Sequence, residues 1–454
     1  MRARHNIRKV ARRAARRNFN GVARWSGRRI GRIASPQMRL VTGGIARWGV
    51  SILAGAVLIR LAAGGAAQAD DRPVVRSDSP LQPPRSVELV EEWRRGGPDD
   101  EILFGMVVAT ETDEAGNIYA LDSQLSCVEV FSPGGDHLRT ISGQGDGPGE
   151  VRAPQDMAML PDATVGILRF VPAEIVRLET DGTPRSSIRL RPAAMDGTEN
   201  GHGFAVSFGM DCRGGTIVLA AYQSSPTGAG QLRRIFLSRF SESGEEVTCF
   251  REHHMELDFN DIHFVETDFL PSFLLTHAVG PDGRVYIPAA HDRYAIEVYA
   301  PDGALERIIE RPFQPRPRTD REEVRIKALV EAWGRNVPYE VSNDINEAAT
   351  TISDLYVDGD NVLWVRHSRS GVDQPGGVFL TYDTFDPRGR WLQEVSVRAD
   401  GDPWTDGVRF LDGGRALLIK GYVLARWASR NARDVDFGEG DELGAIQLIG
   451  CRVE

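Results

Sequence analysis

Hydrophobic and polar residues alternate in short runs along most of the chain, and residues typical of turns separate these runs. The first clear copy of the pattern is DEAGNIYALD at residues 113–122, followed by VEVFSPGG at 128–135 and HLRTI at 137–141. Alternation with a period of two is typical of strands with one buried face, and Pro and Gly between the runs are typical of tight turns. The pattern therefore predicts short strands joined as antiparallel hairpins.

The same unit recurs along the chain, with an aromatic-x-Pro-x-Gly turn as its most constant part. Close copies are PDGRVYI at 281–287 with IEVYAPDG at 296–303, and DGDNVLWV at 358–365 with YDTFDPRG at 382–389. Weaker copies lie at 161–182 and 211–244. A small sheet of this kind cannot bury both faces alone, so the copies must stack radially. The sequence predicts an all-β fold, a six-bladed β-propeller of four-stranded antiparallel blades.

The sixth blade needs both ends of the chain. The last copy offers strands at 408–411, 415–420 and 445–451 but no outer strand, and VELVEEW at 87–93 has the composition of the missing one. Closure of the last blade by the N-terminal strand would remove a free sheet edge, which otherwise invites aggregation.

With these motifs, residues 85–454 resemble the six-bladed propellers of the NHL-repeat and TolB-like superfamily. The resemblance is carried by GNIY at 116–119, FSPGG at 131–135 and GPG at 147–149. It implies the fold, but members of this superfamily include scaffolds, lyases, lactonases and ligand binders, so it does not imply one activity.

An insertion at residues 311–349 interrupts the repeats between the fourth and fifth copies. Thr319 and Glu322 form a capping box ahead of Val324, Ile326, Leu329, Val330 and Trp333, which predicts one amphipathic helix before Gly334. This helix would either cap a blade edge or end, or form a lid over the central opening.

Residues 1–69 are interpreted as a basic leader and signal peptide, and residues 70–84 as a linker. The segment 48–69 has an apolar stretch interrupted by Arg60, and AQA at 67–69 has the small-x-small form of a cleavage site. The run from Gly49 to Ile59 is shorter than the roughly 20 residues of a membrane span, which disfavours an uncleaved anchor. Met38 is an alternative start. We expect a periplasmic or secreted protein.

Charge divides the chain sharply. Residues 1–69 hold 15 Arg or Lys and no Asp or Glu, which leaves 39 basic and 64 acidic residues in the remainder. So acidic a body repels nucleic acid and anionic lipid, and we expect neither as a partner, nor any membrane contact after cleavage.

The four cysteines, Cys127, Cys212, Cys249 and Cys451, show no CxxC spacing. In an exported protein they allow three fully paired connectivities, or free structural thiols. Cys212 and Cys249 fall within one repeat and are the preferred pair.

Candidate site residues come from the start of each innermost strand, where a propeller crowds its blades around one mouth of the channel. Counting back eight residues from the first apolar residue of the second strand points to Thr110, His277 and Asp354. Asp156 and Asp406 occupy the matching neighbourhood in blades two and six. Carboxylates and an imidazole that converge on the axis could bind a polar ligand or a divalent cation. Polar residues that only line a wet channel would have the same pattern.

Two functions are compatible with these observations. The favoured one is an exported, non-catalytic binding or scaffold propeller, a monomer without a cofactor that recognises a protein, peptide or glycan. The alternative is a metal-assisted lyase or lactone hydrolase, similar to amidating-lyase or gluconolactonase propellers, with Asp156, His277, Asp354 and Asp406 as metal ligands.

Overall fold

A computed structural model describes residues 73–195, 204–334, 341–411, 413–431 and 444–454. The described residues belong to one compact unit, residues 68–454. The predicted leader and signal peptide at 1–69 lie outside the described residues. None of the described helices has the length and apolar character needed to cross a bilayer.

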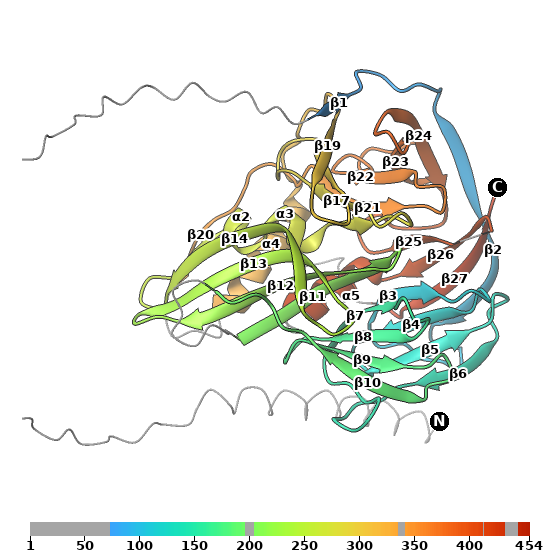
Figure 1. The fold of residues 1–454 in the computed structure, drawn as a ribbon. Coiled ribbons are helices and arrows are strands. Elements are labelled where there is room, and N and C mark those ends of the chain that lie inside the picture. The colour runs from blue at the N-terminus through green and yellow to red at the C-terminus, as the bar shows by residue number, and fades with distance from the viewer. Residues whose placement is uncertain (1–72, 196–203, 335–340, 412, 432–443) are drawn as a thin grey trace, which may run out of the picture. The chain divides into compact units, whose positions relative to one another are not determined.

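Small antiparallel sheets make up most of the described structure and lie in a propeller-like arrangement (Figure 1). The first sheet is formed by β3 (Val107–Thr112), β4 (Ile118–Asp122), β5 (Cys127–Phe131) and β6 (His137–Ile141). The second is formed by β7 (Pro154–Met159), β8 (Val165–Arg169), β9 (Glu174–Leu178) and β10 (Pro184–Arg189). The third is formed by β11 (Phe204–Arg213), β12 (Thr216–Pro226), β13 (Gly230–Phe240) and β14 (Glu246–Asp258).

The fourth sheet has an additional strand at its outer edge. It is formed by β16 (Ala278–Val279), β17 (Val285–Pro288), β18 (Ala295–Tyr299) and β19 (Leu305–Glu310), with β1 (Val74–Arg76) parallel to β19. Two short helices precede it, α2 (Glu266–Phe269) and α3 (Ser272–Leu275). The segment of residues 70–84, predicted as a linker, therefore supplies a strand.

The other eight propeller strands join in one eight-stranded sheet instead of two separate blades. Its first half is formed by β21 (Ile352–Val357), β22 (Leu363–His367), β23 (Val378–Phe385) and β24 (Trp391–Arg398). Its second half is formed by β25 (Gly407–Leu411), β26 (Arg415–Lys420), β27 (Gln447–Val453) and β2 (Arg85–Gly96). Six separate blades were expected, whereas the described residues form four separate sheets of this kind and one double sheet.

The double sheet exists because β2 hydrogen-bonds on both sides. Its first residues pair in parallel with β24, and the residues from Leu89 to Gly96 pair antiparallel with β27. The pairing with β27 is the closure predicted for the N-terminal strand. The extra pairing with β24 was not foreseen.

The recurrent turn glycines explain how the sheets stack. Gly135 has a φ of +85°, and a Cβ there would lie 2.4 Å from Cδ2 of Trp93 on β2. Only glycine tolerates both this conformation and this approach. Later turns repeat the relation to the outer strand of the preceding sheet: Gly182 against Ile141, Gly244 against Ile188, Gly303 against Thr248, and Gly389 against Ile309. The aromatic-x-Pro-x-Gly turn is thus a contact between neighbouring sheets.

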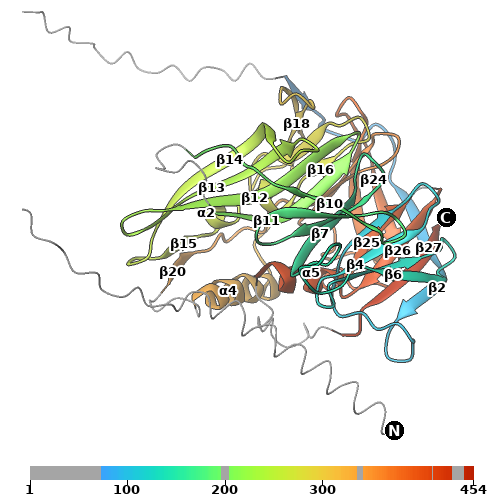
Figure 2. The same ribbon diagram turned by 60° about the horizontal axis from the view of Figure 1, so that its bottom comes forward.

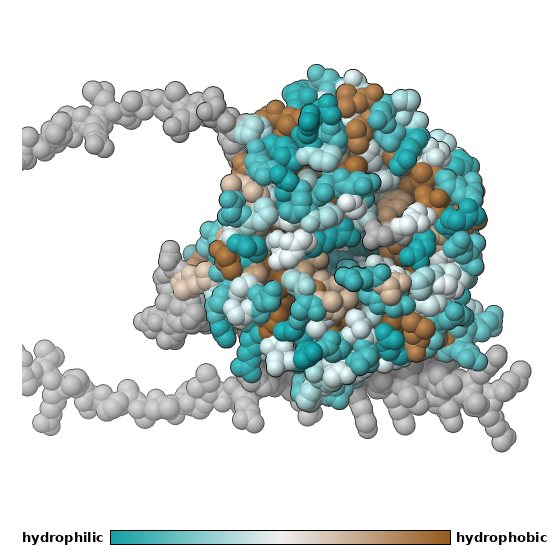
Figure 3. All heavy atoms as spheres, turned by 45° about the vertical axis from the view of Figure 1, so that its right-hand side comes forward, coloured by the Kyte–Doolittle hydropathy of each residue, from teal (hydrophilic) through white to brown (hydrophobic). Residues whose placement is uncertain are grey.

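The hydrophobic core lies between the sheets. One cluster joins the β3–β6 and β7–β10 sheets to β26 and β27 of the double sheet, and another joins the two halves of the double sheet. Three further clusters join successive sheets from β7–β10 to β21–β24. On the face shown in Figure 3, hydrophobic residues are scattered among hydrophilic ones.

The insertion folds as predicted around its capping box. The Glu322 backbone N–H donates to Thr319 Oγ1 (3.3 Å), and the Thr319 N–H donates to Glu322 Oε2 (2.9 Å), at the start of α4 (Asp320–Gly334). The insertion also contributes β20 (Ser342–Asp344), which pairs in parallel with β15 (His263–Val265). Figure 2 shows α4 beside α5 (Tyr422–Asn431), a helix between β26 and β27 that the strand pattern did not predict.

The preferred cysteine pair is wrong: all four cysteines are free thiols. Cys212 is on β11 and Cys249 on β14, the two opposite edge strands of a four-stranded sheet. Three strand spacings separate them by about 14 Å, whereas a disulfide needs Cα atoms within about 7 Å.

Candidate functional site

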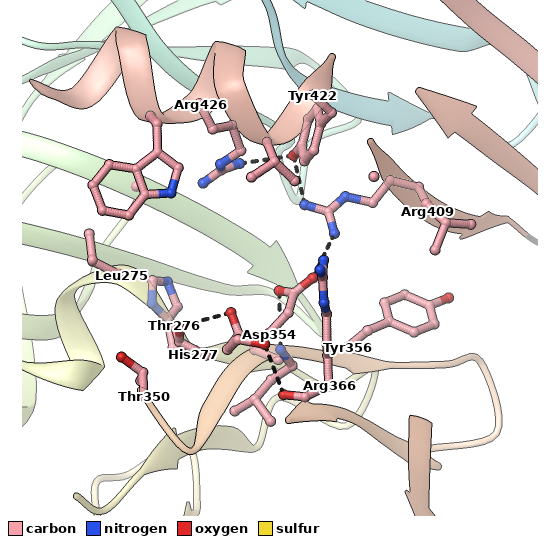
Figure 4. A pocket seen from close by; sticks show the side chains of 18 of the residues that line it. Leu275, Thr276, His277, Thr350, Asp354, Tyr356, Arg366, Arg409, Tyr422 and Arg426 are labelled. Carbon is pink, nitrogen blue, oxygen red and sulfur yellow. Dashed lines mark hydrogen bonds and ion pairs between the residues drawn. The ribbon is translucent and has the colours of Figure 1, made fainter. Parts of the chain in front are cut away.

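A cavity of about 510 Å³ lies where the innermost strands converge. Its wall contains residues of β3, β7, β11, β16, β21 and β25, the first strand of each four-stranded set. Residues of α3, α4 and α5 also belong to the wall. Figure 4 shows Leu275 of α3 and Tyr422 and Arg426 of α5. The cavity is therefore the covered end of the central channel, where the sequence placed its candidate residues.

Irregular pairing at the start of the inner strands sets the direction of two candidate side chains. The register of β7 against β8 shifts between Pro154 and Asp156, and that of β21 against β22 shifts between Ile352 and Asp354. The bulge in each strand precedes the aspartate directly. Such bulges re-aim the side chain that follows them and are common beside functional sites.

Three of the four candidate residues, Asp156, His277 and Asp354, lie in the cavity wall. Asp406 does not. Its carboxylate is buried and accepts hydrogen bonds from the backbone N–H groups of Gly421 and Asp402, both at 2.9 Å. Lys420 Nζ lies 3.1 Å from the same carboxylate. Asp406 therefore organises the turns around β25, away from the axis.

The donor set does not fit a divalent cation. Among the described residues, no group of three or more His, Cys, Asp or Glu side chains is arranged to hold a metal ion. Asp354 Oδ2 lies 3.5 Å from Arg409 Nη1, and Asp156 Oδ2 lies 3.8 Å from Arg426 Nη2. The aspartates that would act as ligands thus face guanidinium groups, which repel a cation.

Arginines, which the sequence analysis missed, dominate the wall. Among the described residues, seven arginines and six carboxylates line the cavity. Arg409 Nη2 and Arg426 Nη1 both donate to the hydroxyl oxygen of Tyr422, at 2.7 and 3.0 Å. Figure 4 shows Arg366, Arg409 and Asp354 directed toward one another beside Tyr422 and Arg426. Arg409 is on β25, whereas Tyr422 and Arg426 are one turn apart on α5.

Residues of the insertion cover the cavity. Arg325 and Ile326 of α4, together with Arg316 just before it, are part of the wall. Arg316 donates to both carboxylate oxygens of Glu322 at 2.7 Å and to the Ser368 carbonyl at 2.6 Å. Burial raises the pKa of Glu322, but its bonds with Arg316 outweigh burial and hold the pKa below the usual value. Of the two expected roles, this placement favours a lid.

The cavity also has an acidic side, formed by Glu111 on β3 and Asp211 on β11. Burial, followed by the charge of Asp211, raises the pKa of Glu111 to about 8. Burial also raises the pKa of Asp211, although Arg213 and a 2.8 Å hydrogen bond from the Val279 N–H oppose it. At neutral pH Glu111 therefore holds its proton.

We expect Glu111→Gln to stabilise the protein increasingly as pH rises. The folded state keeps the Glu111 proton up to about pH 8, whereas the unfolded chain releases it near 4.5, so the wild type loses stability across this window. The free energy of unfolding of the variant relative to the wild type should rise by up to about 4 kcal/mol between pH 5 and pH 8.

Urea unfolding of both proteins at pH 5 and pH 8 measures this difference. Glu114→Gln, on the exposed turn after β3, is the control and should leave the pH dependence unchanged. Parallel pH profiles for Glu111→Gln and the wild type would show that Glu111 titrates normally.

Comparisons with known proteins identify no relative by sequence: no family model and no curated protein match the chain. Among solved structures, a member of the DUF4221 family from Bacteroides vulgatus has a TM-score of 0.45 at 9% identity, over 81% of this chain and 98% of that chain. A gluconolactonase from Xanthomonas campestris has a TM-score of 0.38 at 12% identity (77% and 87% covered). Virginiamycin B lyase from Staphylococcus aureus has a TM-score of 0.37 at 11% identity (73% and 81%).

Proposed function

We propose that this chain is an exported, non-catalytic binding protein that takes the end of a peptide or glycan chain into the cavity at the covered channel mouth. The observation that carries the proposal is the cavity itself. Its polar side chains come from separate inner strands and helices, and hydrogen bonds between them hold several in place before any ligand arrives. Preorganisation of this kind lowers the entropy loss on binding.

For the architecture, we propose an NHL-like, TolB-like propeller in which each half of the eight-stranded sheet acts as one blade, giving six. The sequential contacts of the turn glycines and the innermost strands support this reading. The leader and the AQA motif support export to the periplasm or beyond.

The alternative, a metal-assisted lyase or lactone hydrolase, has less support. Asp156 and Asp354 face arginines, and Asp406 is turned into a network with Lys420 and backbone groups. A protein, peptide or glycan surface can exploit such arginines without a metal, because guanidinium groups donate directly to acidic groups, carbonyls and hydroxyls.

The test is to measure thermal unfolding of the purified protein with a panel of short peptides and oligosaccharides, and then to examine the bound probe by mass spectrometry. A probe present at 100 times its Kd should add about 2.7 kcal/mol to the stability. We expect at least one probe to raise Tm and to be recovered unchanged after long incubation. Absence of any shift, or conversion of the probe over many turnovers, would overturn the proposal.

A further inference from the structure

We propose that the group recognised in the cavity is a carboxylate, bound by Arg409 and Arg366 with Arg426 beside them. The inference rests on the proposed function and deepens it by naming the chemistry of the ligand. A carboxylate can be supplied by the C-terminus of a peptide or by an acidic sugar, and both have the same planar, monoanionic form.

The arginines of the wall differ in how closely they are paired with carboxylates. Arg316 makes a two-pronged pair with Glu322 at 2.7 Å, and Arg318 makes a close ion pair with Glu266. Each of these arginines is already paired with a carboxylate, and the pairs hold the lid in place. Close, charge-assisted pairs of this kind have N···O distances of about 2.7–2.9 Å.

Arg409 is paired more loosely with a carboxylate. Its contact with Asp354 is 3.5 Å long, and its short side-chain hydrogen bond goes to the neutral phenol oxygen of Tyr422. The same oxygen accepts from Nη1 of Arg426, which also donates to the Val108 carbonyl at 3.0 Å. Two guanidinium groups therefore meet at one uncharged acceptor.

Such an arrangement is unfavourable unless an anion uses it. Like charges within the covered end of a channel repel one another more strongly than in water. The 3.5 Å contact with Asp354 leaves part of the fork of Arg409 available to a second carboxylate. A ligand carboxylate placed between Arg409 and Arg366 would accept from both groups and relieve the repulsion.

Arg366 extends the same wall. It lies opposite Asp354 in the pairing of β21 with β22, and its Nη2 donates to the Pro403 carbonyl at 2.8 Å. Among the described residues, no carboxylate lies within ion-pair distance of Arg366. It therefore adds positive charge that no aspartate or glutamate of the described wall neutralises closely.

The charge of the whole wall agrees with a monoanion. In the described part of the wall seven arginines face six carboxylates, and one of these, Glu111, is protonated at neutral pH because its pKa is about 8. The wall is thus positive, although the chain after residue 69 has 25 more acidic than basic residues. Asp156 and Asp354 stand close to the arginines and would repel a dianion such as a phosphate monoester more strongly than a carboxylate.

Aromatic side chains supply the surface for the rest of the ligand. Tyr356, Trp404, Phe410 and Trp427 belong to the same wall. Flat rings bind both the body of a peptide and the apolar face of a sugar, so the aromatic surface by itself does not choose between the two sources.

The decisive measurement compares acids with their neutral analogues on the wild-type protein. Probes are Ac-Ala-Ala and its carboxamide, digalacturonate and its methyl ester, and phenyl phosphate, each measured by isothermal titration calorimetry. We expect one acid to bind at least about tenfold more tightly than its neutral analogue, because the analogue cannot accept charge-assisted hydrogen bonds. The preferred acid identifies the source of the carboxylate.

Variants then locate the effect. Arg409→Gln and Arg366→Gln should each reduce the ratio of acid to neutral affinity. Arg366→Gln removes a hydrogen bond to the Pro403 carbonyl and breaks no ion pair among the described residues, so it should fold normally. Arg185→Gln, an exposed arginine on β10 outside the wall, is the matched control and should keep the wild-type ratio.

The outcomes separate the two proposals. If acid and neutral probes bind equally well, or if both cavity variants keep the wild-type ratio, the carboxylate inference fails while the binding function stands. Tighter binding of phenyl phosphate than of either acid also overturns it. If no probe binds, acid or neutral, neither the binding function nor the inference survives.

Discussion

Asp383→Ala is expected to lower the free energy of unfolding by about 3–5 kcal/mol, because it leaves a buried guanidinium without its counter-charge. Asp383 is fully buried on β23. Arg311 donates to its Oδ2 through Nε at 2.8 Å and Nη2 at 2.6 Å, and the Tyr294 hydroxyl donates to the same oxygen at 2.7 Å. These contacts tie the β16–β19 sheet to the double sheet.

His367 also lies near Asp383, but it is not the cation that Asp383 balances. Burial lowers the pKa of His367 to about 4, so the imidazole is neutral at neutral pH and Arg311 is the cation that Asp383 balances. Asp383→Asn keeps the shape and one acceptor but loses the charge, so its loss of stability should be smaller than that of alanine.

Chemical unfolding at pH 7 measures both variants. The control is Asp78→Ala, which removes an exposed partner of Arg76 and should change stability by less than about 0.5 kcal/mol. A loss below about 1 kcal/mol for Asp383→Ala would show that the cluster relaxes or admits water.

The second large effect is expected from removing β2. A chain that begins at residue 97 lacks the strand that pairs with both β24 and β27. It also loses the buried side chains of Val87 and Leu89, and Trp93, whose Nε1 donates to the Pro133 carbonyl at 3.1 Å. We expect a loss of more than about 5 kcal/mol, comparable to the whole stability of many domains, and therefore no cooperative unfolding transition.

A chain that begins at residue 79 is the matched control. It lacks β1, which pairs only with the edge of β19, and retains β2. Far-ultraviolet circular dichroism during heating should show a cooperative transition for this control and none for the chain from residue 97. A cooperative transition in both would mean that the double sheet closes without its N-terminal strand.

The strands, the turns and the closure of the last blade could be predicted from the sequence because their signals are local. Pro133 and Gly135 specify a turn wherever they stand, and the alternation from 87 to 93 marks a strand that lacks a neighbour in sequence. Thr319 and Glu322 likewise specify a helix start within four residues. The start of each inner strand followed from the same periodicity, which is why Asp156, His277 and Asp354 were placed at the channel.

The helix α5 carried a signal that could have been found. Between Gly421 and the next glycine, Tyr422, Ala425 and Arg426 follow the helical spacing of three and four residues. The sequence analysis assigned no element to residues 421–444, so it missed Tyr422 and Arg426, which lie beside the proposed carboxylate site.

The tertiary structure alone decided which side chains meet. Cys212 and Cys249 lie in one repeat yet on opposite edges of a sheet, and Asp406 starts an inner strand yet turns toward Lys420. Arg409 and Arg426 meet at Tyr422 although each is ordinary in its own segment. Local alternation and turn chemistry determine strands and their order, whereas the direction and pairing of a charged side chain depend on bulges, burial and partners that are distant in sequence.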